Sequence, residues 1–257
     1  MRINETKRRL RDGDCVYGCF IRYPDPGLCE LLALQGFDFL VLDAEHGTIE
    51  PRECENMVRA AELRGPTPVV RVPANQPPVI LRYLDTGAQG LHVPLVGDAA
   101  QADAAVRAVK YWPRGGRGLA GARAASYGQE GTLGEYVAHA NEETLVVIQI
   151  ETREALARVP DIAATDGVDV IFIGPTDLSQ ALGVPGQTTH PSVEEAFDEI
   201  IRGVSGSDAA IGVLAADAAA VQAWRERGAR YIAVTVDSLL TRGARGLLAA
   251  VRDGRGG

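Results

Sequence analysis

The chain has 257 residues with 26 basic and 34 acidic side chains, a formal net charge of −8 and a hydrophobic fraction of 46%. This acidic balance argues against a nucleic-acid-binding surface, which requires clustered positive charge. No apolar run approaches the ~20 residues of a membrane span, and no apolar core follows the basic N-terminal residues, so we expect neither a membrane protein nor a secreted one.

The four cysteines indicate a reducing compartment. Cys15, Cys19, Cys29 and Cys54 stand in apolar or helical surroundings, and none belongs to a C-x-x-C pair. Such cysteines fit reduced, buried thiols better than a zinc site or a disulfide framework. We therefore expect a cytoplasmic protein.

Strand-like and helical patterns alternate along the whole chain. The expected strands are Val16–Ile21, Phe37–Asp43, Pro68–Val72, Gly90–Val96, Leu145–Glu151, Val168–Gly174, Ala210–Leu214 and Tyr231–Val236, and the clearest helical patterns are Pro51–Arg64, Pro77–Thr86, Ala99–Tyr111 and Val193–Val204. Strands rich in Val, Ile and Leu indicate a parallel sheet covered on both faces. Eight such units predict an α/β protein formed by a single TIM (β/α)8 barrel domain, residues 1–257. Because no G-x-G-x-x-G follows the first strand, we expect no nucleotide cofactor.

The second expected strand ends in the sequence DAEH. Asp43 is the last residue of that strand, and Glu45 and His46 follow it. Catalytic groups of such barrels lie at the carboxyl ends of strands, where a histidine can move protons near neutral pH and an aspartate can orient it. An isolated motif of this kind is also compatible with a solvated loop.

The third expected strand ends in Arg71, after Val69 and Val70. A buried arginine requires a planar anionic partner, which would be either a protein carboxylate or a substrate carboxylate. We favour a bidentate contact with a substrate carboxylate, because the nearby acidic groups are better assigned to a metal.

A long connection, Tyr111–Thr144, separates the fourth and fifth expected strands and is rich in glycine and arginine. Long loops in compact domains are commonly functional, so we expect it to cover or border a site. A disordered insertion is the alternative.

The fifth and sixth expected strands carry further polar groups to the same edge. Gln149 and Glu151 share the inward face of one strand, and Asp177 follows the next strand. Two carboxylates with room for water and substrate oxygens describe a site for Mg²⁺ or Mn²⁺. The alternatives are an ion-pair role for Glu151 and a helix N-cap role for Asp177.

Two other kinds of chemistry are disfavoured. The only lysines, Lys7 and Lys110, do not lie at the carboxyl end of a strand, so we expect no Schiff-base lysine. The segments after the last two strands lack a glycine-rich turn, which disfavours a phosphate group on the substrate.

Several segments, taken together and in order, resemble those of one family. They are GFDFLVLDAEHG, VVRVP, LDTGAQGLHVPLV, ARAASYG, VVIQIE, FIGPTDLSQALG and YIAVTVDSLL. Over nearly the whole chain they resemble the HpcH/HpaI-type class II pyruvate aldolases, which are metal-dependent barrel enzymes. The resemblance implies a lyase that cleaves or forms a 4-hydroxy-2-oxo acid, from pyruvate and an aldehyde, through a metal-stabilised pyruvate enolate.

The resemblance also implies roles for matching residues. The metal ligands would be Glu151 and Asp177, the acid–base dyad His46 and Asp43, the pyruvate-binding arginine Arg71, and the lining residues Gln149, Gly174, Pro175 and Thr176. The expected metal is Mg²⁺, with Mn²⁺ or Co²⁺ as substitutes. The expected assembly is a homohexamer, a trimer of dimers that exchange a C-terminal helix at roughly Ser238 to Arg252, in which Asp85 would reach a neighbour's site.

The segments GTIEP and GLAGARAASYG depart from the pattern of the sugar-acid aldolases in this family and leave the aldehyde open. Two alternatives remain. One is a related branch that condenses oxaloacetate with acetyl-CoA to form citrate for siderophores. The other is a barrel that binds a small keto acid without catalysis.

Overall fold

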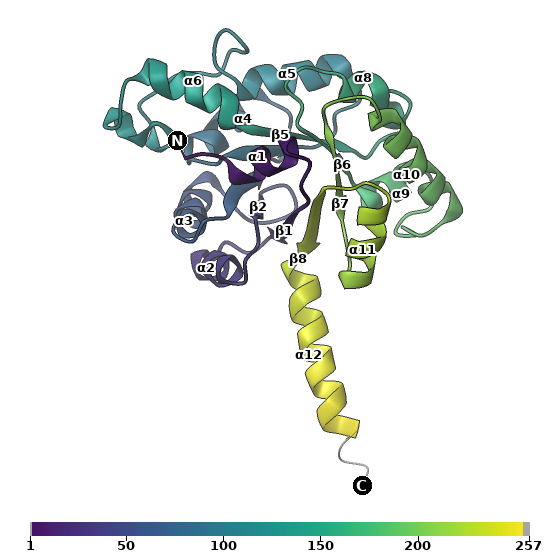
Figure 1. The fold of residues 1–257 in the computed structure, drawn as a ribbon. Helices are drawn as coiled ribbons and strands as arrows, with labels where there is room; N and C mark the ends of the chain where they lie inside the picture. Colours follow the sequence, from purple (N-terminus) through teal and green to yellow (C-terminus); the bar gives the residue numbers. More distant parts are fainter. Residues whose placement is uncertain (1, 254–257) are drawn as a thin grey trace.

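The computed structural model describes residues 2–253 and shows a closed parallel barrel surrounded by helices (Figure 1). The strands are β1 Val16–Ile21, β2 Phe39–Asp43, β3 Thr67–Arg71, β4 Gly90–Val93, β5 Leu145–Ile150, β6 Val170–Ile173, β7 Ala210–Leu214 and β8 Tyr231–Thr235. They pair in chain order, and β8 closes the barrel by pairing with β1. The predicted (β/α)8 barrel is confirmed.

The helices follow the strands as the alternating pattern predicts. They are α1 Glu5–Arg11, α2 Pro26–Leu34, α3 Pro51–Glu62, α4 Pro77–Asp85, α5 Ala99–Val109, the 3₁₀ helix η1 Arg123–Gly128, α6 Leu133–Glu143, α7 Arg153–Leu156, α8 Val159–Ala163, α9 Pro175–Ala181, α10 Pro191–Val204, α11 Ala218–Glu226 and α12 Val236–Asp253. Five of the longer ones, α2, α3, α4, α9 and α10, begin with a proline, whose missing N–H costs nothing in the first turn of a helix. Within residues 2–253, no helix combines the length and the apolar character that crossing a membrane needs.

The strands divide the core into an inner and an outer layer. On β5, Val147 packs inside the barrel, whereas Ile148 and Ile150 pack outward against helices, as the two-residue alternation predicts. The inward face of the same strand continues through Gln149 to Glu151 at its carboxyl end. The strand therefore delivers these two side chains to the mouth of the barrel.

Large rings inside the barrel require a small residue opposite them. Phe39 and Tyr231 stack with ring centroids 3.9 Å apart, and a Cβ added at Gly18 would lie 2.1 Å from the Phe39 ring. Gly18 on β1 pairs with both Phe39 on β2 and Ala233 on β8. The absence of a side chain at this position therefore gives the stacked pair its space.

The long segment between α5 and β5 lies at the amino ends of the strands. It contains η1 and α6. Near the start of β5, the Thr144 carbonyl accepts a hydrogen bond from Lys110, and the Glu143 carbonyl accepts one from Asn4. The expectation that it borders the site of its own chain is wrong, since no residue of this segment lines the cavity at the carboxyl ends. The reason is topological: the segment follows a helix and leads into a strand, so it belongs to the end of the barrel opposite the site.

Helix α12 leaves the carboxyl end of β8 and projects away from the barrel (Figure 1). Its large apolar residues Leu240, Leu247, Leu248 and Val251 are exposed in the single chain. Leu240, Leu247 and Val251 fall on one side of the helix by its 100° advance per residue. The helix therefore presents an apolar stripe that the described part of the chain, residues 2–253, does not cover.

We expect Gly18→Ala to lower the free energy of unfolding by about 1–3 kcal/mol, because the added methyl group collides with the Phe39 ring in a close-packed core. Gly116→Ala is the matched control, since a Cβ there meets nothing within 4 Å. Urea unfolding followed by fluorescence compares the two. Equal stabilities for the two variants would contradict the packing argument.

Candidate active site

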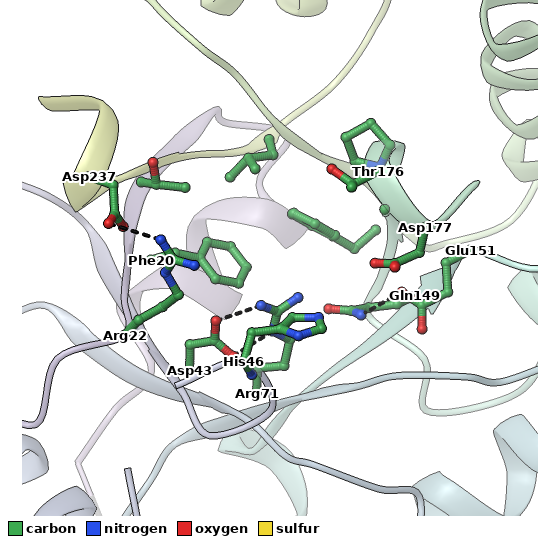
Figure 2. Close-up of a pocket in the computed structure, with 15 residues that line it drawn as sticks. Phe20, Arg22, Asp43, His46, Arg71, Gln149, Glu151, Thr176, Asp177 and Asp237 are labelled. Carbon is green, nitrogen blue, oxygen red and sulfur yellow. Dashed lines mark hydrogen bonds and ion pairs between the residues drawn. The ribbon is translucent and has the colours of Figure 1, made fainter. Parts of the chain in front are cut away.

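A cavity of about 540 Å³ opens at the carboxyl ends of the strands (Figure 2). Its lining residues are Phe20, Arg22, Asp43, His46, Arg71, Gln149, Glu151, Phe172, Gly174, Pro175, Thr176, Asp177, Leu214, Thr235 and Asp237. All nine residues predicted for the site are among them. The residues expected from the strand ends and from the family resemblance therefore meet in one cavity.

Asp43 and Arg71 form a bidentate ion pair between β2 and β3. Their residues are opposite each other in the strand register, and Arg71 donates from Nε and Nη2 to the two Asp43 oxygens at 2.9 and 2.6 Å. Burial alone would raise the pKa of Asp43, but the hydrogen bonds and charge of Arg71 outweigh it and lower that pKa. The bidentate partner of Arg71 is therefore a protein carboxylate, whereas the sequence analysis favoured a substrate carboxylate for this contact.

His46 is placed by its backbone. Its N–H donates to Asp43 Oδ1 at 3.1 Å, while its ring is 52% exposed and has Nε2 3.9 Å from Glu45 Oε2. Among the described contacts, the Asp43 carboxylate touches the amide of His46 and not its imidazole. Asp43 consequently orders the loop that carries the ring, and the predicted dyad stays a prediction.

Glu45 is a half-buried carboxyl, with its side chain 15% exposed, that we did not assign to the site from sequence. Its Oε2 lies 3.3 Å from Arg71 Nε but has no hydrogen bond. Burial raises the pKa of Glu45 to about 7, against the charge of Arg71, and the neighbouring carboxylates Glu151, Asp43 and Asp177 raise it further. The signal was present in the D-x-E-H motif, but only the loop geometry turns this side chain inward.

Glu151 is held by two donors in a buried position. Its Oε1 accepts the Leu95 N–H at 2.6 Å and its Oε2 accepts Gln149 Nε2 at 2.9 Å. Leu95 has φ 56°, a left-handed conformation that is uncommon for residues other than glycine. In this conformation its N–H donates to the Glu151 carboxylate. Burial raises the pKa of Glu151 despite these donors, and the charge of Asp177 adds to that rise.

Asp177 lies in the first turn of α9, whose N-cap is Gly174. The alternative that Asp177 is the N-cap is therefore wrong. A Cβ at Gly174 would approach Glu151 Oε2 to 3.0 Å, so glycine lets the turn and the carboxylate lie close together. Within residues 2–253 the Asp177 carboxylate makes no hydrogen bond or ion pair, and in Figure 2 it points into the cavity on the same side as Glu151.

The donor set between β5 and β6 fits a hard divalent cation. Glu151 and Asp177 supply two carboxylates that form no ion pair within residues 2–253, and burial raises the pKa of Glu151 although the charge of Arg71 acts against that rise. Over residues 2–253, no cluster of three or more His, Cys, Asp or Glu side chains has metal-binding geometry. Such a cation would thus take its remaining oxygen ligands from water and substrate, as Mg²⁺ commonly does.

The outer end of the cavity contains an ion pair that the sequence analysis missed. Arg22 Nη2 lies 2.9 Å from Asp237 Oδ1, which also accepts the Tyr23 hydroxyl at 2.6 Å. Arg22 follows the end of β1, so the strand-end argument could have found it. Asp237, in the first turn of α12, is more than two hundred residues away and gives no local signal.

Three other candidate residues lie away from the cavity. Lys7 and Lys110 both donate to the Thr144 carbonyl at the amino end of β5. Asp85, expected at a neighbour's site, ends α4 and accepts from Arg117 at 2.9 Å.

Comparisons with known proteins agree on one family. Residues 16–244 match the family model described as HpcH/HpaI aldolase/citrate lyase. A hydroxypyruvate/pyruvate aldolase of Pseudomonas aeruginosa is 39% identical, over 98% of this chain and 94% of the relative. A 4-hydroxy-2-oxo-heptane-1,7-dioate aldolase of Klebsiella pneumoniae is 41% identical, over 96% and 93%. The solved structure of the citrate synthase SbnG is 32% identical with a TM-score of 0.86, over 96% of this chain and 97% of that one.

The pKa of Glu45 predicts how stability depends on pH in the metal-free protein. Its folded pKa of about 7 exceeds the ordinary value of 4.5, so the native state binds the proton more tightly, and stability falls as pH rises between these values. In Glu45→Gln the free energy of unfolding should fall less over this pH range, by up to about 3 kcal/mol, because the variant has no carboxyl group to ionise. The measurement is urea unfolding in chelator at pH 5 and pH 8.

The control is Glu199→Gln on the exposed face of α10, which should follow the wild-type profile. If Glu45→Gln kept the full wild-type loss between the two pH values, the burial of an uncompensated Glu45 carboxylate would be refuted.

Proposed function

This chain belongs to the HpcH/HpaI aldolase/citrate lyase family and is an aldolase, a carbon–carbon lyase, and we propose that it forms and cleaves 4-hydroxy-2-oxo acids with pyruvate as the nucleophilic partner. The observation that carries this proposal is the placement of Arg71 across one cavity from the Glu151 and Asp177 carboxylates. Relatives named for aldol reactions of 2-oxo acids over nearly their full length support the substrate class.

We propose that Glu151 and Asp177 hold a divalent cation, Mg²⁺ first and Mn²⁺ or Co²⁺ as substitutes. When bound, it would supply Lewis-acid stabilisation of the negative charge that develops on the substrate's oxygens. Gln149, Gly174, Pro175 and Thr176 line the same side of the cavity and would surround the pyruvate unit.

Arg71 would bind the oxygens of the 2-oxo acid. Asp43 and Glu45 contact only its Nε and Nη2, which leaves the Nη1 donors for a ligand in the cavity. Because Asp43 fixes the guanidinium in advance, its charge is preorganised beside the oxygen that becomes negative in the enolate. Such fixed donors commonly contribute about 3–4 kcal/mol to the stabilisation of a transition state.

His46 would transfer the proton of the C4 hydroxyl group. In cleavage its ring nitrogen takes this proton, directly or through a water, while the C3–C4 bond breaks to give an aldehyde and the pyruvate enolate. Proton return to C3 completes the reaction, and the reverse sequence gives aldol addition. Asp43 supports this step by holding the His46 amide and with it the loop.

The outer end of the cavity would receive the aldehyde. Arg22, Thr235 and Asp237 give that end hydrogen-bonding groups, and Leu214 and Phe20 give it an apolar wall. A short aldehyde that bears a hydroxyl group suits this mixture. A citrate-forming condensation remains the second candidate, because a citrate synthase shares the fold at 32% identity.

We also propose that α12 is exchanged between two copies in a hexamer of three dimers. The stripe of Leu240, Leu247 and Val251 is exposed among residues 2–253, and a second copy of the chain would cover it. In such an assembly Asp85, at the amino end of the barrel, would face the cavity of a neighbouring copy.

Incubation with pyruvate, a hydroxyaldehyde and Mg²⁺ or Mn²⁺ should give a new 2-oxo acid, and a chelator should abolish its formation. Full activity in chelator would favour the citrate-forming alternative, which oxaloacetate and acetyl-CoA then test directly. Pyruvate C3 protons that failed to exchange with solvent deuterium would leave only a keto-acid-binding barrel.

Two variants separate the metal from the proton transfer. Glu151→Gln should lose divalent-ion binding and activity together, measured by calorimetry and by product formation. His46→Ala should keep ion and pyruvate binding but lose about 10²- to 10⁴-fold in cleavage rate, the usual contribution of general acid–base catalysis. Normal cleavage by His46→Ala would show that another group moves the proton.

Leu247→Glu should reduce the oligomer to smaller species in sedimentation velocity, since it places a charge in the covered stripe. Ala249→Glu adds the same charge on the opposite side of α12 and should leave the assembly intact. The same sedimentation pattern for both variants would remove the stripe from the interface.

A further inference from the structure

We propose that His92 and Tyr231, two residues inside the barrel, are positioning residues that orient Glu151 through Gln149. The inference rests on the proposed role of Glu151 as a metal ligand. Tyr231 and His92 do not line the cavity. They would act by fixing the direction of a chain of hydrogen bonds that ends on the Glu151 carboxylate.

The first link joins β8 to β4 across the barrel interior. Tyr231 Oη lies 2.9 Å from His92 Nε2, and both side chains are fully buried. The His92 ring is also enclosed by Phe20 and Phe172, with ring centroids at 5.3 and 4.8 Å. Burial lowers the pKa of His92 to about 3, and the charge of Arg71 lowers it further. The ring is therefore neutral, with one N–H donor and one acceptor nitrogen.

The second link joins β4 to β5. His92 pairs with Val147 in the strand register, so Gln149 is the next inward residue toward the carboxyl end. His92 Nδ1 and Gln149 Oε1 are both buried, and neither atom has a hydrogen-bond partner. The Gln149 side chain nevertheless acts on the His92 ring, because its effect opposes that of burial and raises the pKa of His92. The two atoms are complementary if Nδ1 carries the proton. A hydrogen bond between them would satisfy both.

The third link fixes the amide of Gln149. Its Nε2 donates to Glu151 Oε2 at 2.9 Å, which leaves Oε1 as the atom without a partner. The flipped amide would set Oε1 against a carboxylate oxygen. The Glu151 charge therefore selects the orientation in which Gln149 presents an acceptor to His92.

These links admit one direction of donation. Tyr231 O–H donates to His92 Nε2, His92 Nδ1–H faces Gln149 Oε1, and the Gln149 amide donates to Glu151. The opposite His92 tautomer would place two acceptors, Nδ1 and Gln149 Oε1, against each other. It would also leave the Tyr231 hydroxyl without an acceptor, which is costly inside a protein. The Tyr231 hydroxyl and Gln149 Oε1 thus together determine which nitrogen of His92 carries the proton.

The chain has a consequence for the metal site. One Glu151 oxygen is held by Leu95 N–H and the other by Gln149, so the carboxylate is oriented before a cation arrives. Groups that orient metal ligands in this way typically contribute 10- to 100-fold to metal affinity. A purely structural polar pair in the core would contribute to folding but not to ion binding.

Tyr231→Phe tests the proposal because it removes one hydroxyl group and keeps the ring that stacks on Phe39. We expect Mn²⁺ affinity, measured by calorimetry, to fall about 10- to 100-fold. The turnover number at saturating Mn²⁺ should change much less than the Mn²⁺ concentration at half-maximal activity. Tyr83→Phe is the matched control, since it removes another buried hydroxyl that bonds the Ile49 carbonyl away from the cavity.

Nitrogen-15 NMR of the metal-free protein supplies a readout independent of activity. The wild-type His92 ring should be the Nδ1–H tautomer, and Tyr231→Phe should shift it toward Nε2–H. An Nε2–H ring in the wild type, or unchanged Mn²⁺ affinity in Tyr231→Phe, would overturn the proposal. Should the wild type bind no Mn²⁺ or Mg²⁺, the proposed metal site itself would fail, and with it the role of this chain.

Discussion

The ion pair between Asp43 and Arg71 is the interaction on which the rest of the site depends. It joins the carboxyl ends of β2 and β3, and it gives the Arg71 guanidinium, whose side chain is only 14% exposed, a bidentate carboxylate partner. Asp43 also accepts hydrogen bonds from the backbone N–H groups of Glu45 and His46, and these bonds order the loop after β2. The Asp43 carboxylate therefore positions the Arg71 guanidinium and the loop that carries Glu45 and His46.

The carboxylates in the cavity differ in how fully a positive charge compensates them. Asp43 is matched by Arg71, and its pKa is lowered. Glu45 and Glu151 lack an equal counterpart, and burial raises the pKa of both. Uncompensated carboxylates in a buried position are costly unless a cation joins them. Under the proposed function, the side of the cavity between β5 and β6 would hold the divalent ion, and the side between β2 and β3 would bind the anionic substrate.

The two ends of the barrel have separate tasks. At the amino end, Lys7 and Lys110 donate to the Thr144 carbonyl and tie the long segment before β5 to the barrel. At the carboxyl end, the cavity is open and α12 departs with its apolar stripe uncovered. Asp237, in the first turn of that helix, pairs with Arg22 in the cavity. Any displacement of α12 in an assembly would consequently reach the end of the cavity that contains Arg22.

The sequence by itself determined the barrel and the set of groups at its mouth. Alternating strand and helix patterns are local, and a closed parallel barrel sends every strand end to the same edge, so Asp43, Arg71, Gln149, Glu151 and Asp177 could be named in advance. Tertiary structure alone decided which partner each group takes. The pairing of Asp43 with Arg71, the inward turn of Glu45 and the meeting of Arg22 with Asp237 depend on register, loop geometry and contacts across the barrel. These relations join residues distant in the chain, and no local pattern records them.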